Sequence, residues 1–447
     1  MPELLDLARR IAESARPGEE VEAYVSWHRD TDIRVYEGDV ESLSSAESAG
    51  IGVRVVSGGR QGFAYVGNLD ERLAREALEE ARDNAGFASP DDHVGLAAPD
   101  GVAAQPLELW RDALASFPTA DKVALALDLE ARVRAGDPRI RQVVSTDYGD
   151  GQAESAVATS TGIAVASRRT NCYLSADVVA GAGDDTQTGV GYTVGREPAE
   201  FDVADAAGDA IERATRLLGA KKPKSARLDV VLDRRVTATL LAILSGTLSG
   251  EEVAKGRSLF AGRIGEQVAT TSLTLVDDPT NPLAFGATVY DAEGLACRRN
   301  ALVESGRLSG FLYDTYSARL AGTASTASAV RAGFKSTPGV GARALSLVPG
   351  DVDQEAMIAA VANGLLVQEV SGVHSGVNPV SGDFSVGAEG LLIREGSLAE
   401  PVREITIAST LQKMLLGVLA VGSDVEWLPG VACGVSLTLA DVAMSGS

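Results

Sequence analysis

A short basic segment, GAKKPKSAR at residues 219–227, divides the sequence near its middle. It places a proline between a predicted helix over residues 202–218 and a predicted strand over residues 228–232, an arrangement typical of a linker between domains. A chain of 447 residues is also too long to form one compact core. We therefore expect two domains, an N-terminal domain over residues 1–220 and a C-terminal domain over residues 227–447.

The sequence contains 48 glycines and only 5% aromatic residues, with many Val, Thr and Ser residues. This combination predicts numerous strands and tight turns. Separate strands are predicted over residues 21–28 and 32–36, and turns at residues 57–59, 149–151, 160–162, 183–185, 305–306 and 395–396. Amphipathic helices are predicted over residues 4–15, 70–84, 120–135 and 202–218. Because strands and helices mix without a βαβ rhythm, we predict the α+β class, with a mixed α/β N-terminal domain and a strand-rich α+β C-terminal domain.

The net charge restricts the kinds of partner that the chain can bind, and the cysteine content indicates the cellular compartment. The formal net charge is −22, and nucleic-acid affinity comes largely from Lys and Arg, so we expect no direct nucleic-acid partner. Cys172, Cys297 and Cys433 are widely spaced and give no disulfide framework or CxxC knuckle, which favours a reducing cytoplasm. The N-terminus does not resemble a signal peptide, and no apolar stretch is long enough to span a membrane.

The sequence lacks the local motifs of the common hydrolases. A zincin site needs two histidines on one helical face, usually HExxH, with the glutamate as general base. The only histidines are His28, His93 and His374, and no two are close enough in sequence to share one helix. GxSxG, GxGxxG and GxxxxGK[ST] are also absent. A local metal, serine-nucleophile or phosphate-binding motif is therefore excluded.

One glycine-rich stretch, SGVHSGVNPVSGDFSVGAE at residues 371–389, contains four candidate functional residues. They are His374, Asn378, Asp383 and Glu389. Glycine-rich backbone can approach a ligand or a partner closely, so we expect this stretch to line a cavity or a partner contact. A long surface loop between strands is an equally good interpretation.

Two further features have both a functional and a structural interpretation. Cys433, in VACG, is either a remnant of a metal site or a small buried residue, and burial is favoured. The predicted helix over residues 235–246 is hydrophobic nearly all round, which implies burial on more than one side. Core packing explains that better than an interface does.

Five segments in order resemble the TldD/PmbA family and cover nearly the whole chain. They are GIGVRVVSGGRQGFAYV at 50–66, GRSLFAGRIGEQV at 256–268, DAEGLACRRNALVESGRLSGFLYDTYSARLAG at 291–322, SGDFSVGAEGLLIREGSLAEPVREITIAS at 381–409, and LGVLAVGSDVEW with ACG at 416–434. Each segment alone is weak, and the ordered set is specific. The resemblance implies a two-domain fold of the TldD/PmbA type.

The family has two branches, and the sequence resembles the PmbA (TldE) branch. TldD-like members carry HExxxH at the start of the C-terminal domain, bind zinc and use a cysteine near the C-terminus. Here the matching helix reads TLLAILSG at residues 239–246, and Cys433 stands where the C-terminal cysteine is expected. One thiolate without histidine partners cannot hold zinc. The resemblance thus implies no metal and no catalytic residue in this chain.

Membership also implies partners. The resemblance implies a TldD-like metallopeptidase subunit that supplies the zinc, and a peptide or unfolded segment as substrate. A stand-alone homodimer that binds peptides without cutting them is the alternative hypothesis. A role as a modulator of DNA gyrase, attached to the family by name, would have to be indirect because of the net charge.

Overall fold

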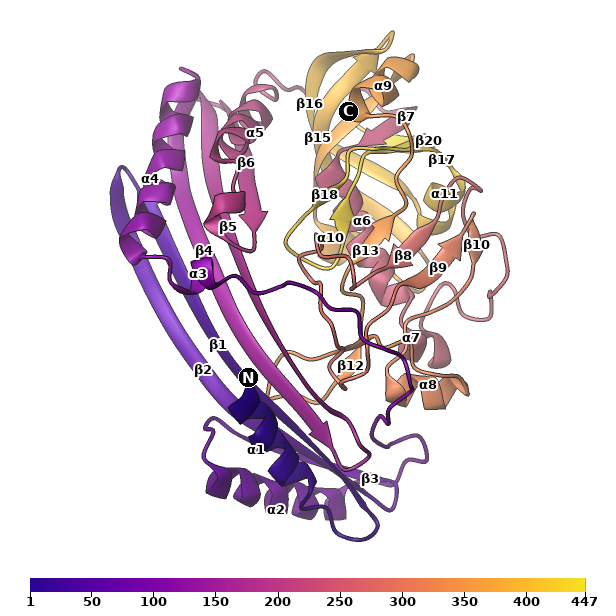
Figure 1. Cartoon of the computed structure of the whole chain (residues 1–447). Coiled ribbons are helices and arrows are strands. Elements are labelled where there is room, and N and C mark those ends of the chain that lie inside the picture. The colour runs from indigo at the N-terminus through magenta and orange to yellow at the C-terminus, as the bar shows by residue number, and fades with distance from the viewer. Residues whose placement is uncertain (447) are drawn as a thin grey trace.

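Six antiparallel strands form the N-terminal sheet in the computed structural model, which describes residues 1–446, and their order is β3-β2-β1-β4-β5-β6 (Figure 1). They are β1 Glu19–Tyr36, β2 Asp39–Ser57, β3 Arg60–Val66, β4 Ile140–Thr159, β5 Ala164–Ala182 and β6 Asp185–Gly195. Four of the strands are long, so the sheet extends along one whole side of the molecule (Figure 1). The fold is α+β, as predicted.

Helices cover only the outer face of this sheet (Figure 1). They are α1 Pro2–Ala12, α2 Glu71–Phe87, α4 Thr119–Gly136 and α5 Val203–Thr215, with the short α3 Asp112–Ala115 and the 3₁₀ helix Pro198–Glu200 between them. Alternate strand residues such as Val53 and Leu174 pack against these helices, because successive side chains of a strand point to opposite faces. The inner face is turned toward the C-terminal domain.

Most of the predicted turns are confirmed, and one is wrong. Gly58 and Gly59 join β2 to β3 with φ values of 56° and 70°, which glycine adopts readily. The predicted turn at residues 149–151 lies instead inside β4. A Cβ on Gly149 would come within 2.3 Å of the Tyr173 ring, so this glycine permits close packing rather than a turn. The two strands predicted over residues 21–36 are likewise one continuous strand, β1.

The C-terminal domain is built on a second six-stranded sheet with the order β16-β15-β14-β7-β20-β17, beside a four-stranded sheet with the order β10-β9-β8-β13. Its longer strands are β7 Ala226–Leu232, β14 Asn363–Ser371, β15 Asp383–Arg394, β16 Ser397–Thr410 and β20 Leu437–Ser445. The shorter strands are β8 Leu275–Asp277, β9 Asn300–Glu304, β10 Arg307–Leu308, β11 Ala329–Val330, β12 Gly339–Val340, β13 Leu345–Leu347, β17 Val418–Val421, β18 Glu426–Trp427 and β19 Cys433–Gly434. The largest hydrophobic core lies between the two sheets and helix α6, Arg234–Thr247.

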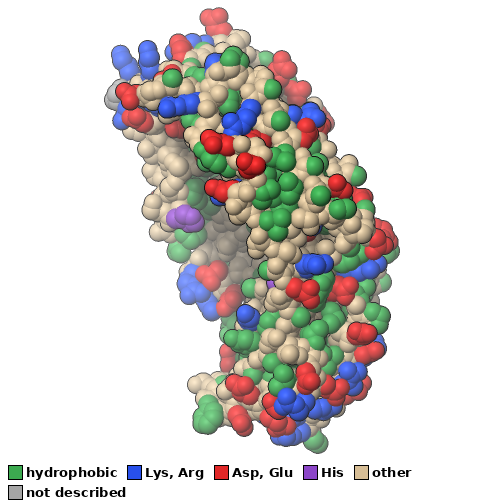
Figure 2. All heavy atoms as spheres, turned by 90° about the vertical axis from the view of Figure 1, so that its left-hand side faces the viewer, with side chains coloured by type: hydrophobic (Ala, Val, Ile, Leu, Met, Phe, Trp, Pro, Cys, Tyr) green, Lys and Arg blue, Asp and Glu red, His purple; other side chains and the backbone are tan. Residues whose placement is uncertain are grey.

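The other helices of this domain are short. They are α7 Gly250–Ala254, α8 Thr315–Ala321, α9 Gln354–Ala360, α10 Val373–Gly376 and α11 Leu411–Leu416. None of the helices within residues 1–446 combines the length and hydropathy that a membrane span requires. On the face shown in Figure 2, acidic and basic side chains are interspersed around a hollow and form no basic stripe.

A long segment between α2 and α3, residues 88–111, connects the two domains and is called the strap. It leaves the N-terminal domain, runs along the C-terminal domain and returns across the sheet (Figure 1). Asp100 forms an ion pair with Arg298 at 2.7 Å, and Asp91 accepts a hydrogen bond from the Tyr316 hydroxyl at 3.0 Å. Leu109 packs in a small apolar cluster of the C-terminal domain. The domains are therefore joined by the strap as well as by the linker.

Candidate functional site

Helix α6 stands where the resemblance places a zinc motif, and its start is firmly held. Asp233 caps the helix by accepting the Arg235 backbone N–H, and it also accepts a hydrogen bond from Arg213 of α5 at 3.0 Å. Asp233 and Arg213 are both buried, so the pair joins α6 to the N-terminal domain. The acidic group nearest the start of the helix is thus used for capping and ion pairing.

The side of α6 that faces β14, β15 and β16 is apolar. A small void there is lined by Leu232, Val236, Thr239, Leu240, Ile243, Val370, Val373, Phe384, Ile407 and Met414. The single polar side chain in that set, Thr239, donates its hydroxyl to the Arg235 carbonyl at 3.0 Å. Zinc in proteins is held by thiolate, imidazole or carboxylate groups. The donor set on this helix therefore does not fit a zinc ion.

Cys433 lies on β19, beside the start of α6. Its Sγ lies 3.3 Å from the Glu426 carbonyl oxygen, and the side chain is buried. Burial raises the pKa of the Cys433 thiol to about 12, which keeps it protonated at neutral pH. No group of three His, Cys, Asp or Glu side chains within residues 1–446 is arranged to hold a metal ion.

The four candidates at residues 371–389 do not converge on one point. His374 is exposed on α10, and Asn378 is an exposed turn residue whose side chain accepts the Val380 and Ser381 N–H groups. Asp383 starts β15 and accepts a hydrogen bond from Ser381, while Glu389 pairs with Glu369 in the sheet. None of the four lines the cavity between the domains. Their role at a partner contact stays a prediction.

A cavity of about 610 Å³ lies between the inner face of the N-terminal sheet and the C-terminal domain. The sheet contributes side chains of β1, β4 and β5, and the opposite wall comes from residues 288–292, 331–333 and Arg343. The strap closes one side through residues 107–110. A volume of this size is typical of sites that bind ligands.

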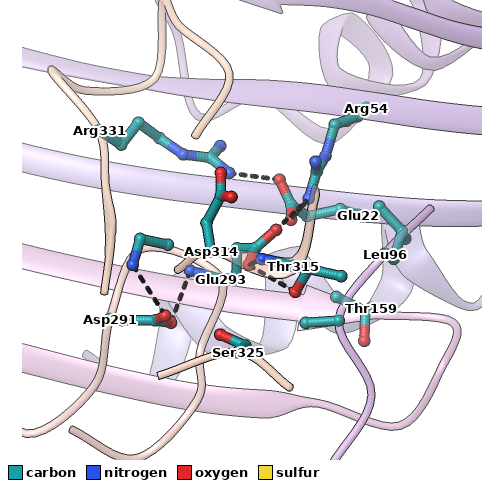
Figure 3. Close-up of polar contacts among 12 residues, drawn as sticks. Glu22, Arg54, Leu96, Thr159, Asp291, Glu293, Asp314, Thr315, Ser325 and Arg331 are labelled. Atoms are coloured by element: carbon teal, nitrogen blue, oxygen red, sulfur yellow. Dashed lines mark hydrogen bonds and ion pairs between the residues drawn. The ribbon is translucent and has the colours of Figure 1, made fainter. Parts of the chain in front are cut away.

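A buried ionic network lies at one end of this cavity and joins the domains (Figure 3). Glu22 of the N-terminal sheet accepts hydrogen bonds from Arg54 at 2.6 Å and from Arg331 at 2.5 Å. Arg54 also lies 3.5 Å from Glu293, whose carboxylate accepts the Thr315 hydroxyl at 2.6 Å. The side chains of the four charged residues are at most 5% exposed. Such a network is costly to break, because the remaining charge stays buried.

The environment of each carboxylate explains the direction of its pKa. Burial alone would raise the pKa of Glu22, but the guanidinium groups of Arg331 and Arg54 outweigh that effect and lower it. Burial raises the pKa of Glu293, although Arg54 opposes the change. Burial and the neighbouring Glu293 raise the pKa of Asp291 to about 7, even though Asp291 accepts three backbone N–H groups. The network therefore contains the firmly ionised Glu22 and a second carboxylate, Glu293, that resists ionisation, and the neighbouring Asp291 resists it as well.

None of these network residues was singled out from the sequence. Asp291 and Glu293 lie in DAEGLACRRN, one of the segments that carry the family resemblance, but nothing in that spacing marks them as buried. Glu22 occupies an alternate position of a predicted strand and could have been identified as a buried charge only once the inner face was known to be covered.

The comparisons with known proteins extend over most of the chain. Models of the PmbA/TldA metallopeptidase match it as domain 1 at residues 21–85, the central domain at 112–218 and the C-terminal domain at 225–446. Metalloprotease PmbA of Escherichia coli O157:H7 is 27% identical over 449 residues, which cover 100% of this chain and 96% of that protein. A metalloprotease of Methanothermobacter thermautotrophicus is 30% identical over 404 residues, 89% of this chain and 86% of that one. The crystal structure of TldE from Thermococcus kodakarensis has a TM-score of 0.86 at 24% identity and covers 100% of both chains.

Proposed function

This chain belongs to the PmbA/TldD metallopeptidase family, and from that premise we propose that it is the zinc-free subunit of a two-chain peptidase. A TldD-like partner would hold the zinc and carry out the hydrolysis of peptides or unfolded segments. The observation that supports this proposal is the apolar side of α6, which Leu240 and Ile243 line and where no side chain could bind a metal ion.

The side chains available for metal binding near α6 support a zinc site in the partner and none in this chain. A catalytic zinc needs three protein ligands and an open position for water. Cys433 is a single buried thiol beside α6, and the carboxylate that caps this helix, Asp233, is engaged by Arg213 and by the helix backbone. This chain then has no role in activating water. Its contribution is to enclose and bind the substrate and to present a surface to its partner.

Co-expression with a TldD-like chain from the same organism tests the proposal. We expect the two chains to co-purify, and zinc analysis to find metal in the pair but less than stoichiometric metal in this chain alone. Cleavage of an unstructured peptide should require both chains. It should be lost when the partner's HExxxH histidines are replaced. Full zinc occupancy together with cleavage by this chain alone would contradict the proposal.

A second candidate is a homodimer that binds peptides without cleaving them. The cavity of about 610 Å³ favours it, since both walls come from one chain. Size-exclusion chromatography separates the two candidates. A homodimer that persists when a TldD-like chain is added would favour the second.

A further inference from the structure

One strand of the N-terminal sheet has an unpaired edge inside the cavity. β6 pairs with β5 only from Cys172 onward, so the first half of β5 is bonded to β4 on one side alone. The strap reaches this edge at Thr170, whose N–H donates to the Leu109 carbonyl at 2.9 Å and whose hydroxyl oxygen accepts the Arg111 N–H at 3.1 Å. Trp110 of the strap lies against the guanidinium of Arg168. Ala166, Ser167 and Arg168, just before that point, line the cavity.

The contact at Thr170 fixes which backbone groups point into the cavity. In an antiparallel strand the N–H and C=O of a residue point to one side, and alternate residues point to opposite sides. Because the Thr170 N–H points away from β4, the amides and carbonyls of Ala166 and Arg168 do so too. Within residues 1–446, these groups make no hydrogen bond. Unpaired edge groups of this kind are a template for another strand.

A cationic side chain lies beside this edge. Arg169 points from the inner face of β5 and lines both the main cavity and an adjoining one of about 240 Å³, together with Arg343. It remains exposed although it lies deep between the domains. Among the described residues it makes no hydrogen bond or ion pair. Partial loss of solvent between the two walls of the cavity and then the like charge of Arg343 lower the pKa of Arg169, and an anion bound between the two guanidinium groups would oppose the second effect.

The acidic side chains of the cavity do not neutralise this pair. Glu154 is bonded to the Met1 amino group at 2.5 Å, and Asp30 lies 3.8 Å from His28. Asp291 resists ionisation, and Glu108 is exposed on the strap. None of the four forms an ion pair with Arg169 or Arg343 in the described part of the chain. Within the described residues, the side chains of Arg169 and Arg343 thus have no carboxylate partner, and the Arg343 guanidinium donates only to the Ala329 carbonyl at 3.1 Å.

We propose that the free edge of β5 and Arg169 bind an extended peptide that carries a carboxylate, either an acidic side chain or a C-terminus. The peptide adds to the sheet as a strand beside Ala166 and Arg168, and its carboxylate lies on the inner face, opposite Arg169. A cross-strand pair of opposite charges stabilises such an addition. This inference rests on the proposed function only in taking a peptide as the ligand, and it concerns this chain alone.

Fluorescence anisotropy with the purified protein tests whether Arg169 binds a carboxylate of the peptide. The probe is an unstructured labelled peptide with several Asp and Glu residues, compared with its Asn and Gln counterpart and with a C-terminally amidated form. We expect Arg169→Gln to weaken binding of the acidic peptide roughly tenfold, and added salt to weaken binding to the unaltered chain. Arg34→Gln is the matched control, since Arg34 lies on the same sheet and pairs with Asp147 at 2.7 Å outside the cavity.

The amidated form identifies the source of the carboxylate. Loss of binding on amidation assigns the C-terminus, and retained binding assigns acidic side chains; either result supports the site. Equal binding of the acidic peptide by Arg169→Gln and the unaltered chain overturns it. So does stronger binding of a DNA oligonucleotide than of the peptide.

N-methylated peptides test the strand addition. Two versions of the acidic peptide carry N-methyl groups on alternate residues, one on the odd and one on the even positions. Pairing to one strand edge uses only one of these sets. We expect one version to lose affinity and the other to keep it. Equal affinity of both versions for the chain overturns the addition of a strand to β5.

These outcomes are independent of the two-chain proposal. If the chain binds the acidic peptide through Arg169 but gives no peptidase with any TldD-like partner, the proposed function fails and this site stands. If the pair cleaves peptides and Arg169→Gln changes neither binding nor KM, the site fails alone.

Discussion

The two faces of the N-terminal sheet are made by the same strands and have opposite character. On the outer face, Leu174 and its neighbours meet helices and form a continuous apolar core. On the inner face, Glu22, Arg54 and Arg169 meet the other domain across a cavity and a charged network. The alternation of side chains along a strand lets one face form the core while the other lines the cavity that we propose as a peptide site. Variants on each face can test whether the two faces act independently.

The largest expected effect is on the inner face. Glu22→Gln leaves Arg54 and Arg331 buried without their shared counter-charge. Removing one partner of a buried network typically costs about 3–5 kcal/mol. We expect a loss of that size in the free energy of unfolding, measured by urea denaturation monitored through tryptophan fluorescence. A loss as small as that of a surface variant would mean that the network contributes little to the domain contact.

A somewhat smaller loss is expected from the outer face. Leu174→Ala removes a fully buried side chain from the core between the sheet, α4 and α5. Large-to-small changes of this kind cost about 2–5 kcal/mol. Calorimetry or urea denaturation should detect the loss, while affinity for the acidic peptide should be unchanged at temperatures where the variant is folded. A parallel loss of peptide affinity would break the separation of the two faces.

The protonation of Asp291 should make the stability of the fold decrease as the pH rises from acid toward neutral. The pKa of Asp291 is raised from 3.8 to about 7 in the folded chain, so its protonated form is favoured by folding. Stability from this group is complete below the unfolded value and decreases as the pH rises toward 7. We expect the unfolding temperature of Asp291→Asn to fall less between pH 5 and pH 8 than that of the unaltered chain. Identical pH profiles would contradict the assignment.

The smallest effect should come from the solvent side of the outer layer. Arg72 and Glu76 form an ion pair on α2 with both side chains mostly exposed. Exposed pairs of this spacing contribute little to stability. Arg72→Ala should leave the unfolding midpoint almost unchanged, and it serves as the reference for the Glu22 and Asp291 variants. A large shift in the unfolding midpoint would show that exposed ion pairs of this domain stabilise it as much as buried ones do.

The sequence predicts local structure well, but it predicts contacts between distant segments of the chain poorly. The helix over residues 70–84 follows from the cap at Asp70, and the β2–β3 turn follows from Gly58 and Gly59, because each depends on neighbouring residues. The sequence predicts a turn at Gly149, but this position requires glycine because the Tyr173 ring of the neighbouring strand packs against it. Periodicity can place Glu22 on one face of β1. It cannot say that Arg331, far along the chain, will cover that face.

The candidate site shows the same limit. The apolar character of α6 is readable from its residues, and the structure places them in the core. The sequence does not indicate that Arg169 lies at a site, because an arginine in a predicted strand is usually a solvated surface residue. Its environment depends on three features of the tertiary structure. They are the residue at which β6 stops pairing with β5, the point at which the strap contacts β5, and the packing of the two domains.

The strap has a consequence for recombination between relatives. A chimera joined at the linker would appear to exchange one complete domain for another. The strap would nevertheless bring Asp91 and Asp100 against a foreign surface that need not offer the equivalents of Tyr316 and Arg298. A functional chimera would therefore have to take the strap and the C-terminal domain from the same parent, so that these contacts are kept.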